Sequence, residues 1–273
     1  MVQGSEQLFS LPKVFYQLQT ALSDPDKSFE DFGAIISHDP ALSARLLRIV
    51  NSPFYGLSSR VETISHALSI VGLDQLVDLA MATSVIYQFR GIPNTLFNME
   101  SFWKHSIAAG LAARTIGQLR GEDNVERLYL AGILHDLGRL VIYMKEPTLA
   151  RDAFYRSKEK EENIHLSEQA LMGFDHAEVG GELLRSWQLP ESLVQAVAFH
   201  HEPARCKEFP VVAAVVHTAD YLVHDMNIAK SEEFYVPVLD TQTWEKIQID
   251  PKELARKIMD VQDQFEQTLQ MFL

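Results

Sequence analysis

Histidine and aspartate side chains occur in this sequence where apolar helices are expected to be buried. His200 and His201 lie three and four residues beyond Val197, so on a helix they prolong its apolar stripe. Asp220 stands inside an apolar segment that starts near Val211. Buried imidazoles and carboxylates cost free energy when they lack partners. Since a shared metal ion would satisfy such groups together, the sequence indicates a metal centre.

Seven residues from five segments form the candidate ligand set, in the order His, His-Asp, His, His-His and Asp. Imidazole and carboxylate groups suit iron, manganese, zinc or similar divalent ions. The single cysteine, Cys206, excludes a site of several thiolates, and its place after a loop favours an exposed thiol. One histidine alone is more commonly a hydrogen-bonded residue than a ligand, so the ordered set carries the prediction. The candidate ligands are His105, His135, Asp136, His176, His200, His201 and Asp220.

The elements that must position these residues are predicted to be helices. Apolar residues recur at spacings of three and four, as at positions 212, 215, 216, 219 and 222, and strict alternation of apolar and polar residues is rare. A helix start is indicated where Asp39 can cap a helix that has Pro40 in its first turn. The sequence therefore predicts an all-α protein.

The expected organisation is a two-lobed helical bundle. Gly91, Pro93 and Asn94 interrupt the helical pattern, which places a boundary near residue 95. Residues 1–95 then form an N-terminal helical lobe, and residues 96–273 form a helical lobe with the metal site and a C-terminal helix. Apolar residues at 254, 258, 261, 265 and 269 line one face of that last helix. We expect this face to pack on the protein's own core rather than on a partner helix.

Composition excludes several classes of partner. The 273 residues include 37 acidic and 24 basic side chains, a net charge of −13, whereas nucleic acids and anionic membranes attract cationic surfaces. We therefore expect neither nucleic acid nor membrane as a partner. The longest aliphatic run, residues 211–216, is far shorter than a bilayer span, and residues 1–10 show no signal-peptide pattern. A cytoplasmic protein is expected.

The ordered ligand set resembles that of the HD superfamily of metal-dependent phosphohydrolases, whose equivalent residues bind one or two metal ions inside a helical bundle. The resemblance implies that the seven residues hold one or two divalent transition metal ions. For an enzyme of this type it also implies catalytic roles for Asp136 and Arg139. Gly138-Arg139 stands where many members carry Gly-Lys, and Arg139 would hold a phosphate bidentately rather than as a point charge.

Further segments resemble the HDOD domain, the HD-related output domain. They are residues 36–42 (ISHDPAL), 46–56 (LLRIVNSPFYG), 65–72 (SHALSIVG) and 171–180 (LMGFDHAEVG). The resemblance covers roughly residues 8–224. It implies a bacterial, helical, two-lobed domain of signal transduction proteins, many of which are regarded as noncatalytic outputs or scaffolds.

The sequence leaves two functions from different classes open. The first is a stand-alone signalling or regulatory module with an HD-type metal site, which binds a signalling protein or a small phosphorylated ligand. The alternative is a metal-dependent phosphohydrolase acting on a nucleotide or another phosphoester. Glu202-Pro203-Ala204 follows His201 in place of the Gly-Tyr-Pro of the HD-GYP branch, which argues against hydrolysis of cyclic di-GMP. The oligomeric state also stays open.

Overall fold

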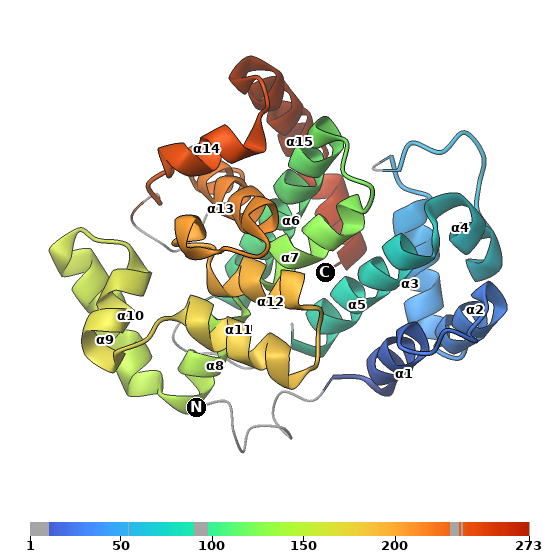
Figure 1. Cartoon of the computed structure of the whole chain (residues 1–273), viewed down its shortest axis with the longest axis horizontal. Coiled ribbons are helices and arrows are strands. Elements are labelled where there is room, and N and C mark those ends of the chain that lie inside the picture. Colours follow the sequence, from blue (N-terminus) through green and yellow to red (C-terminus); the bar gives the residue numbers. More distant parts are fainter. Residues whose placement is uncertain (1–10, 54, 90–97, 230–234, 236, 273) are drawn as a thin grey trace. The chain divides into compact units, whose positions relative to one another are not determined.

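The computed structural model describes the chain except for residues 1–10, 54, 90–97, 230–234, 236 and 273. Within the described part, all regular secondary structure is helical and no β-strand occurs (Figure 1). The prediction of an all-α protein is confirmed. The chain divides into two compact units, one formed by Phe9–Ile92 with Gln262–Leu273 and the other centred on Pro93–Val261. The predicted boundary near residue 95 lies outside the described residues.

The N-terminal unit is built of short amphipathic helices with apolar faces turned inward and of one longer, largely buried helix. Asp39 accepts a hydrogen bond from the Leu42 N–H at 2.9 Å and precedes Pro40, so the predicted helix start is confirmed. Ser28 and Asp31 form a capping box at the preceding helix. The helices of this unit are α1 (Lys13–Leu22), α2 (Phe29–Ser37), α3 (Pro40–Val50), α4 (Ile64–Val71) and α5 (Leu73–Phe89).

The second unit contains the helices that position the predicted ligands. Helix α6 packs against α7 and α13, while α11 packs against α8 and α12. Figure 1 shows α6, α7 and α13 next to α11 and α12 in the same unit. The elements are α6 (Met99–Arg120), α7 (Val125–Leu134), α8 (Leu137–Lys145), α9 (Pro147–Lys160), α10 (Ile164–Met172), α11 (His176–Ser186), α12 (Glu191–Ala198), η1 (Pro203–Arg205), α13 (Pro210–Asp225) and α14 (Thr241–Ile247).

Two close backbone approaches bring the ligand-bearing helices of this unit together. A Cβ atom added to Gly132 of α7 would lie 2.7 Å from the Cα atom of Gly110 in α6. A Cβ atom added to Gly138 of α8 would lie 1.9 Å from the carbonyl oxygen of His176 at the start of α11. Only glycine leaves room for these approaches, so the two positions fix how closely the helices that carry His105, His135 and His176 can pack.

The last helix, α15 (Pro251–Phe272), has the apolar face predicted for residues 250–273. Leu254, Ile258, Phe265 and Leu269 are buried, and Val261 is half-buried. Asp250 caps this helix by accepting a hydrogen bond from the Lys252 N–H at 2.8 Å. The predicted burial of this face in the protein's own core is therefore confirmed.

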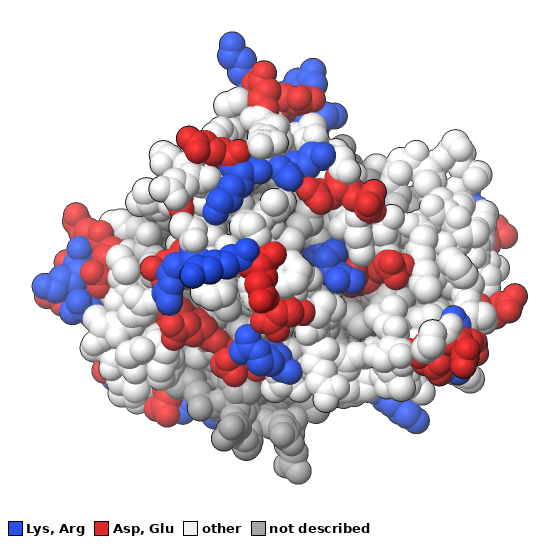
Figure 2. All heavy atoms as spheres, in the orientation of Figure 1, with Lys and Arg blue, Asp and Glu red and all other residues white. Residues whose placement is uncertain are grey.

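Exposed charges of opposite sign occur close together. On the face shown in Figure 2, acidic and basic side chains are interspersed. Arg185 pairs with Glu182, and Arg205 pairs with Glu202. Among the described helices, none has by itself the length and apolar character needed to cross a bilayer, although the bent pair α4 and α5 meets both criteria when taken together.

Candidate metal centre

The structure brings the seven predicted ligand residues together inside the unit Pro93–Val261. Six of them are at most 4% exposed, and His201 is half-buried. Because these residues come from elements far apart in the sequence, tertiary packing produces the cluster. They lie in α6 (His105), at the junction of α7 and α8 (His135 and Asp136), at the start of α11 (His176), after α12 (His200 and His201) and in α13 (Asp220).

The positions of His200 and His201 differ from the prediction. Helix α12 ends at Ala198, so the two histidines lie in the turn that follows rather than on the helix. The prediction that they prolong a helical stripe is wrong. Glu202 precedes Pro203, and a residue before proline is driven away from the helical conformation. The turn nevertheless buries the His200 ring completely.

One group of candidate ligands consists of His105, His135 and Asp220. The Nε2 atom of His105 lies 3.0 Å from Oδ1 of Asp220 and 3.3 Å from Nε2 of His135. The Nε2 atom of His135 lies 3.7 Å from the same Asp220 oxygen. Ligand atoms at about 2.0–2.1 Å from a tetrahedral ion are roughly 3.3–3.4 Å apart. These spacings therefore fit donors that surround one cation.

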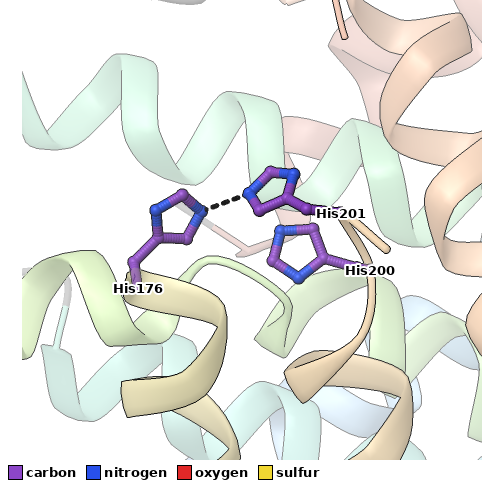
Figure 3. Close-up of side chains that lie close together, drawn as sticks. All are labelled: His176, His200 and His201. Carbon is purple, nitrogen blue, oxygen red and sulfur yellow. Dashed lines mark hydrogen bonds between the residues drawn. The ribbon is translucent and has the colours of Figure 1, made fainter. Parts of the chain in front are cut away.

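A second group consists of His176, His200 and His201, whose ligand atoms lie within 4.8 Å of one another. Figure 3 shows the three rings facing one another from α11 and from the turn after α12. The Nε2 atoms of His176 and His201 are 2.8 Å apart. The imidazole set is therefore compact enough to bind a second cation.

Asp136 stands between the two groups. Its Oδ1 atom lies 3.1 Å from Nε2 of His176, 3.6 Å from Nε2 of His135 and 3.8 Å from Nε2 of His200. Asp136 and His200 also combine with His135 into a third set of donors whose ligand atoms lie within 4.8 Å. A carboxylate in this position can contact cations in both groups.

Backbone carbonyl groups orient two of the imidazoles. Nδ1 of His135 donates to Gly132 O, and Nδ1 of His200 donates to Val197 O, each at 2.7 Å. Because a carbonyl oxygen only accepts, Nδ1 of each ring carries a proton, and Nε2, which holds the lone pair when the ring is neutral, faces the centre. Nε2 of His200 is buried and has no hydrogen-bond partner within the described part of the chain. The donor set thus fits a divalent cation.

Glu168 orients a third imidazole, although it was not among the predicted site residues. Its Oε2 atom accepts hydrogen bonds from the His176 backbone N–H at 2.9 Å and from His176 Nδ1 at 2.6 Å. Glu168 is 3% exposed in α10. A carboxylate that fixes the far nitrogen of a ligating histidine is common around metal sites. Its burial depends on how α10 meets the start of α11, and we identify no sequence signal for that contact.

Three more histidines surround the centre. Nε2 of His224 lies 3.4 Å from Oδ1 of Asp220, and its spacing of four residues on α13 is a signal that could have identified it. The ring of His165 stacks on that of His201 with centroids 4.0 Å apart. His217 donates from Nδ1 to the His200 carbonyl oxygen at 2.7 Å. It therefore holds the backbone of the turn that carries His200.

Nearby charges lower the pKa values of the two buried aspartates in the centre, against the effect of burial. Burial alone raises a carboxyl pKa, but the charges of His135 and Arg139 hold the pKa of Asp136 well below its usual range. His224 acts in the same way and holds the pKa of Asp220 well below its usual range despite burial. Both groups are therefore carboxylates near neutral pH, which is the state that binds cations.

The imidazoles of the second group differ from one another in protonation. Burial, with the nearby rings of His135 and His176, lowers the pKa of His200 to about 3, so this ring is neutral. Burial also opposes protonation of His176, but the charge of Glu168 outweighs it and holds the pKa of His176 well above its usual range. Cation binding at His176 must therefore release a proton.

Arg139 lies against the centre rather than at a free surface. Its Nη1 atom is 3.2 Å from Oδ2 of Asp136, and the residue is 7% exposed. A buried ion pair of this kind fixes both side chains, because separating them would leave a buried charge without compensation. The phosphate contact expected of Arg139 stays a prediction.

Comparison with known proteins relates the chain to a family over most of its length. Residues 8–203 match the HDOD domain family. The chain is 29% identical, over 208 residues and 75% of its length, to an uncharacterized protein of Treponema pallidum (strain Nichols). It spans 40% of the length of that relative.

Solved structures with the same fold come from more than one bacterium. An HDOD domain protein with unknown function from Geobacter sulfurreducens superimposes with a TM-score of 0.79 at 22% identity, covering 95% of this chain and 92% of that one. A Shewanella amazonensis SB2B protein named as a candidate phosphohydrolase gives 0.78 at 24% identity, covering 99% and 97%. These likenesses establish the fold, and together with the match over residues 8–203 they show that the chain belongs to the HDOD domain family.

Proposed function

We propose that the chain is a regulatory module of bacterial signal transduction in which the unit Pro93–Val261 binds one or two divalent transition metal ions. The observation that carries this proposal is the His200 ring, whose Nδ1 atom donates to Val197 O while its buried Nε2 atom has no hydrogen-bond partner among the described residues. An unpaired buried nitrogen costs free energy, and a cation at that place removes the cost.

The donor chemistry limits the choice of metal. Imidazole nitrogens and carboxylate oxygens suit iron, manganese or zinc. Two separate donor groups with Asp136 between them favour two ions, and either group alone offers three donors to a single ion. The proposed ligands are His105, His135, Asp136, His176, His200, His201 and Asp220.

The burial of the centre favours regulation over turnover. Six of the seven proposed ligands are at most 4% exposed, which leaves a phosphoester little direct access to them. A buried metal instead links the ends of α7, α11 and α12 to α6 and α13, so its binding stabilises one arrangement of these helices. We propose that a cytoplasmic signalling protein or a small phosphorylated ligand responds to that arrangement.

Elemental analysis of the purified full chain tests the metal centre. We expect at least one equivalent of iron, manganese or zinc per chain, retained through gel filtration. Asp136→Ala removes the carboxylate between the two groups and is expected to lower the metal content severalfold. His66→Ala removes an exposed histidine of the other unit and should leave the content unchanged. Metal-free protein after growth with added manganese, iron and zinc would contradict the proposal.

A metal-dependent phosphohydrolase is the second candidate, and the Arg139–Asp136 ion pair favours it. A bound divalent metal supplies Lewis acidity toward water and phosphoryl oxygens. Arg139 would turn from Asp136 to orient a phosphate, and Asp136 would stay among the residues that hold the metal. Hydrolysis assays with nucleotides and p-nitrophenyl phosphate test this function. Activity that Arg139→Ala lowers at least tenfold without changing metal content would favour the enzyme; no activity above that of Asp136→Ala would exclude it for these substrates.

A further inference from the structure

The N-terminal unit contains a cavity that the metal centre does not use. It has a volume of about 940 Å³ and lies between the second half of α3 and the described residues 51–53 and 57–62. Leu47, Pro53, Leu57 and Val61 contribute an apolar wall. Cavities of roughly 300–1,000 Å³ are typical of small-molecule sites, so the size admits a nucleotide-sized ligand.

Asn51, which lines this cavity, makes three hydrogen bonds. Its Nδ2 atom donates to Leu47 O and to Val61 O, and its Oδ1 atom accepts from the Val61 N–H, each at 2.7 Å. The end of α3 is thereby joined to the far end of the segment 51–61. Arg48 lies one helical turn before Asn51, and Arg60 directly precedes Val61; both arginines are among the residues that line the cavity.

These two arginines form a cationic site in an acidic protein. Arg48 and Arg60 are exposed, and neither makes an ion pair with a residue that the structure describes. Among the described residues that line the cavity, Glu62 alone is acidic. The chain as a whole carries a net charge of −13. Unpaired arginines at a concave surface are therefore available to an anion from solution.

A buried hydroxyl provides the second, independent observation. Ser52 lines the same cavity and is 5% exposed. Its Oγ atom has no hydrogen-bond partner within the described part of the chain. Buried hydroxyl groups are normally hydrogen-bonded, because burial without a partner costs free energy. A ligand oxygen that reaches this buried hydroxyl from the cavity would accept the hydrogen bond that it can donate.

We propose that this cavity binds a small phosphorylated molecule of nucleotide size, with its phosphate groups on Arg48 and Arg60 and its organic part against Leu47, Pro53 and Leu57. The Ser52 hydroxyl donates to a ligand oxygen. The site lies in a different unit from the proposed metal ligands, so this inference does not rest on the metal centre. It assigns a chemical class to a ligand that the N-terminal unit binds independently of the metal.

Isothermal titration calorimetry on the full chain tests the site, with ATP, GTP and glucose 6-phosphate as probes and adenosine as an uncharged control. We expect saturable binding of at least one phosphorylated probe, no binding of adenosine, and weaker binding as salt is raised. The double variant R48A/R60A should weaken binding at least about tenfold, because each arginine supplies a charge-assisted hydrogen bond. Ser52→Ala should weaken it severalfold.

Matched controls distinguish probe binding at this cavity from nonspecific effects of net charge and from binding at the metal centre. R151A/R185A removes two exposed arginines of the other unit and should bind the probe as the unmodified chain does. Metal-loaded and chelated protein should bind it equally. Thermal denaturation checks that each variant is folded. If R48A/R60A is not folded, the single variant Arg60→Glu replaces it in the binding test. Absence of binding by every probe, unchanged binding in folded R48A/R60A, or binding that disappears with the metal would overturn the proposal.

Discussion

At the scale of single residues, the candidate centre depends on hydrogen bonds that fix imidazole rings. Carbonyl oxygens of Gly132 and Val197 hold His135 and His200, whereas a buried carboxylate holds His176. These contacts decide which nitrogen of each ring carries the proton and which lone pair faces the other ligands. The ligand atoms are therefore arranged before a cation arrives, which lowers the entropy lost on binding.

Glu168 is predicted to be a positioning residue for His176. Glu168→Ala removes the acceptor of two hydrogen bonds and should weaken metal binding by about 10–100-fold. Glu168→Gln keeps a carbonyl oxygen at this place and should restore much of the affinity. Competition titrations with a chromogenic chelator measure both, and Glu182→Ala on the exposed face of α11 is the control. Equal affinity in Glu168→Ala and the unmodified chain would disprove this role.

Cys206 is predicted to be a slowly reacting thiol. The expectation of an exposed thiol is wrong, because the residue is 2% exposed and Sγ donates to Gln195 Oε1 at 3.4 Å. Burial raises the pKa of this thiol, so the thiolate fraction at pH 7–8 is smaller than for a free cysteine. Labelling with Ellman's reagent should be slow in native protein, accelerate as pH rises above 9, and become fast in denaturant. Fast native labelling at pH 7 would contradict the buried position.

At the scale of elements, the ligands gather because helix ends meet. His135 follows the end of α7, Asp136 precedes α8 and His176 begins α11, while α6 and α13 contribute His105 and Asp220 from their interiors. The close approach at Gly138 sets the distance between α8 and α11. The centre therefore depends on glycine positions that touch no ligand atom.

Gly138→Ala tests this dependence. The added methyl group would overlap the carbonyl oxygen of His176 at 1.9 Å, so α8 must move away from α11 and Asp136 must move away from His176. We expect a loss of about 2–3 kcal/mol in the free energy of unfolding, together with a lower metal content. In Gly33→Ala of α2 the methyl group would lie 3.5 Å from Leu68 Cδ1, and helix propensity predicts a gain of up to about 1 kcal/mol.

Urea denaturation and elemental analysis measure both variants. Equal stability and metal content in Gly138→Ala and the unmodified chain would show that α8 and α11 do not pack through this contact. A destabilised Gly33→Ala would instead indicate that replacing glycine is harmful throughout the protein. A destabilised Gly138→Ala would then not be evidence for a specific contact between α8 and α11.

At the scale of the whole molecule, the chain combines two units with different chemistry. The unit Pro93–Val261 contains the proposed metal ligands, and the unit with Phe9–Ile92 contains the arginine-lined cavity. All histidines except His38 and His66 lie at or around the proposed centre. The histidines are thus concentrated in the unit that contains the proposed metal ligands.

Metal removal is predicted to destabilise the protein. A cation present at 100 times its Kd contributes about 2.7 kcal/mol, which for a domain of this size corresponds to a change in Tm of roughly 5–10 °C. Calorimetry before chelation, after chelation and after addition of manganese measures the change. Asp136→Ala is the control and should show little response to either treatment. An unchanged Tm after complete metal removal would contradict a metal that joins these helices.

Local patterns in the sequence were sufficient to specify the helical class and the identity of the candidate ligands. Apolar spacing and the Asp39-Pro40 start specify helices because these signals are local, and they hold in the structure. The order of histidines and aspartates identified side chains that converge, since buried polar groups must find partners wherever the chain folds. That these groups bind a metal stays a prediction.

Packing between helices established which atoms meet. The contact of Glu168 with His176 and the place of Asp136 between two groups depend on this packing, which no local pattern encodes. Helix α12 ends at Ala198, before His200, and the burial of the His200 Nε2 atom facing Asp136 required the surrounding helices. Local chemistry thus selects the residues, and long-range packing sets the distances on which their chemistry depends.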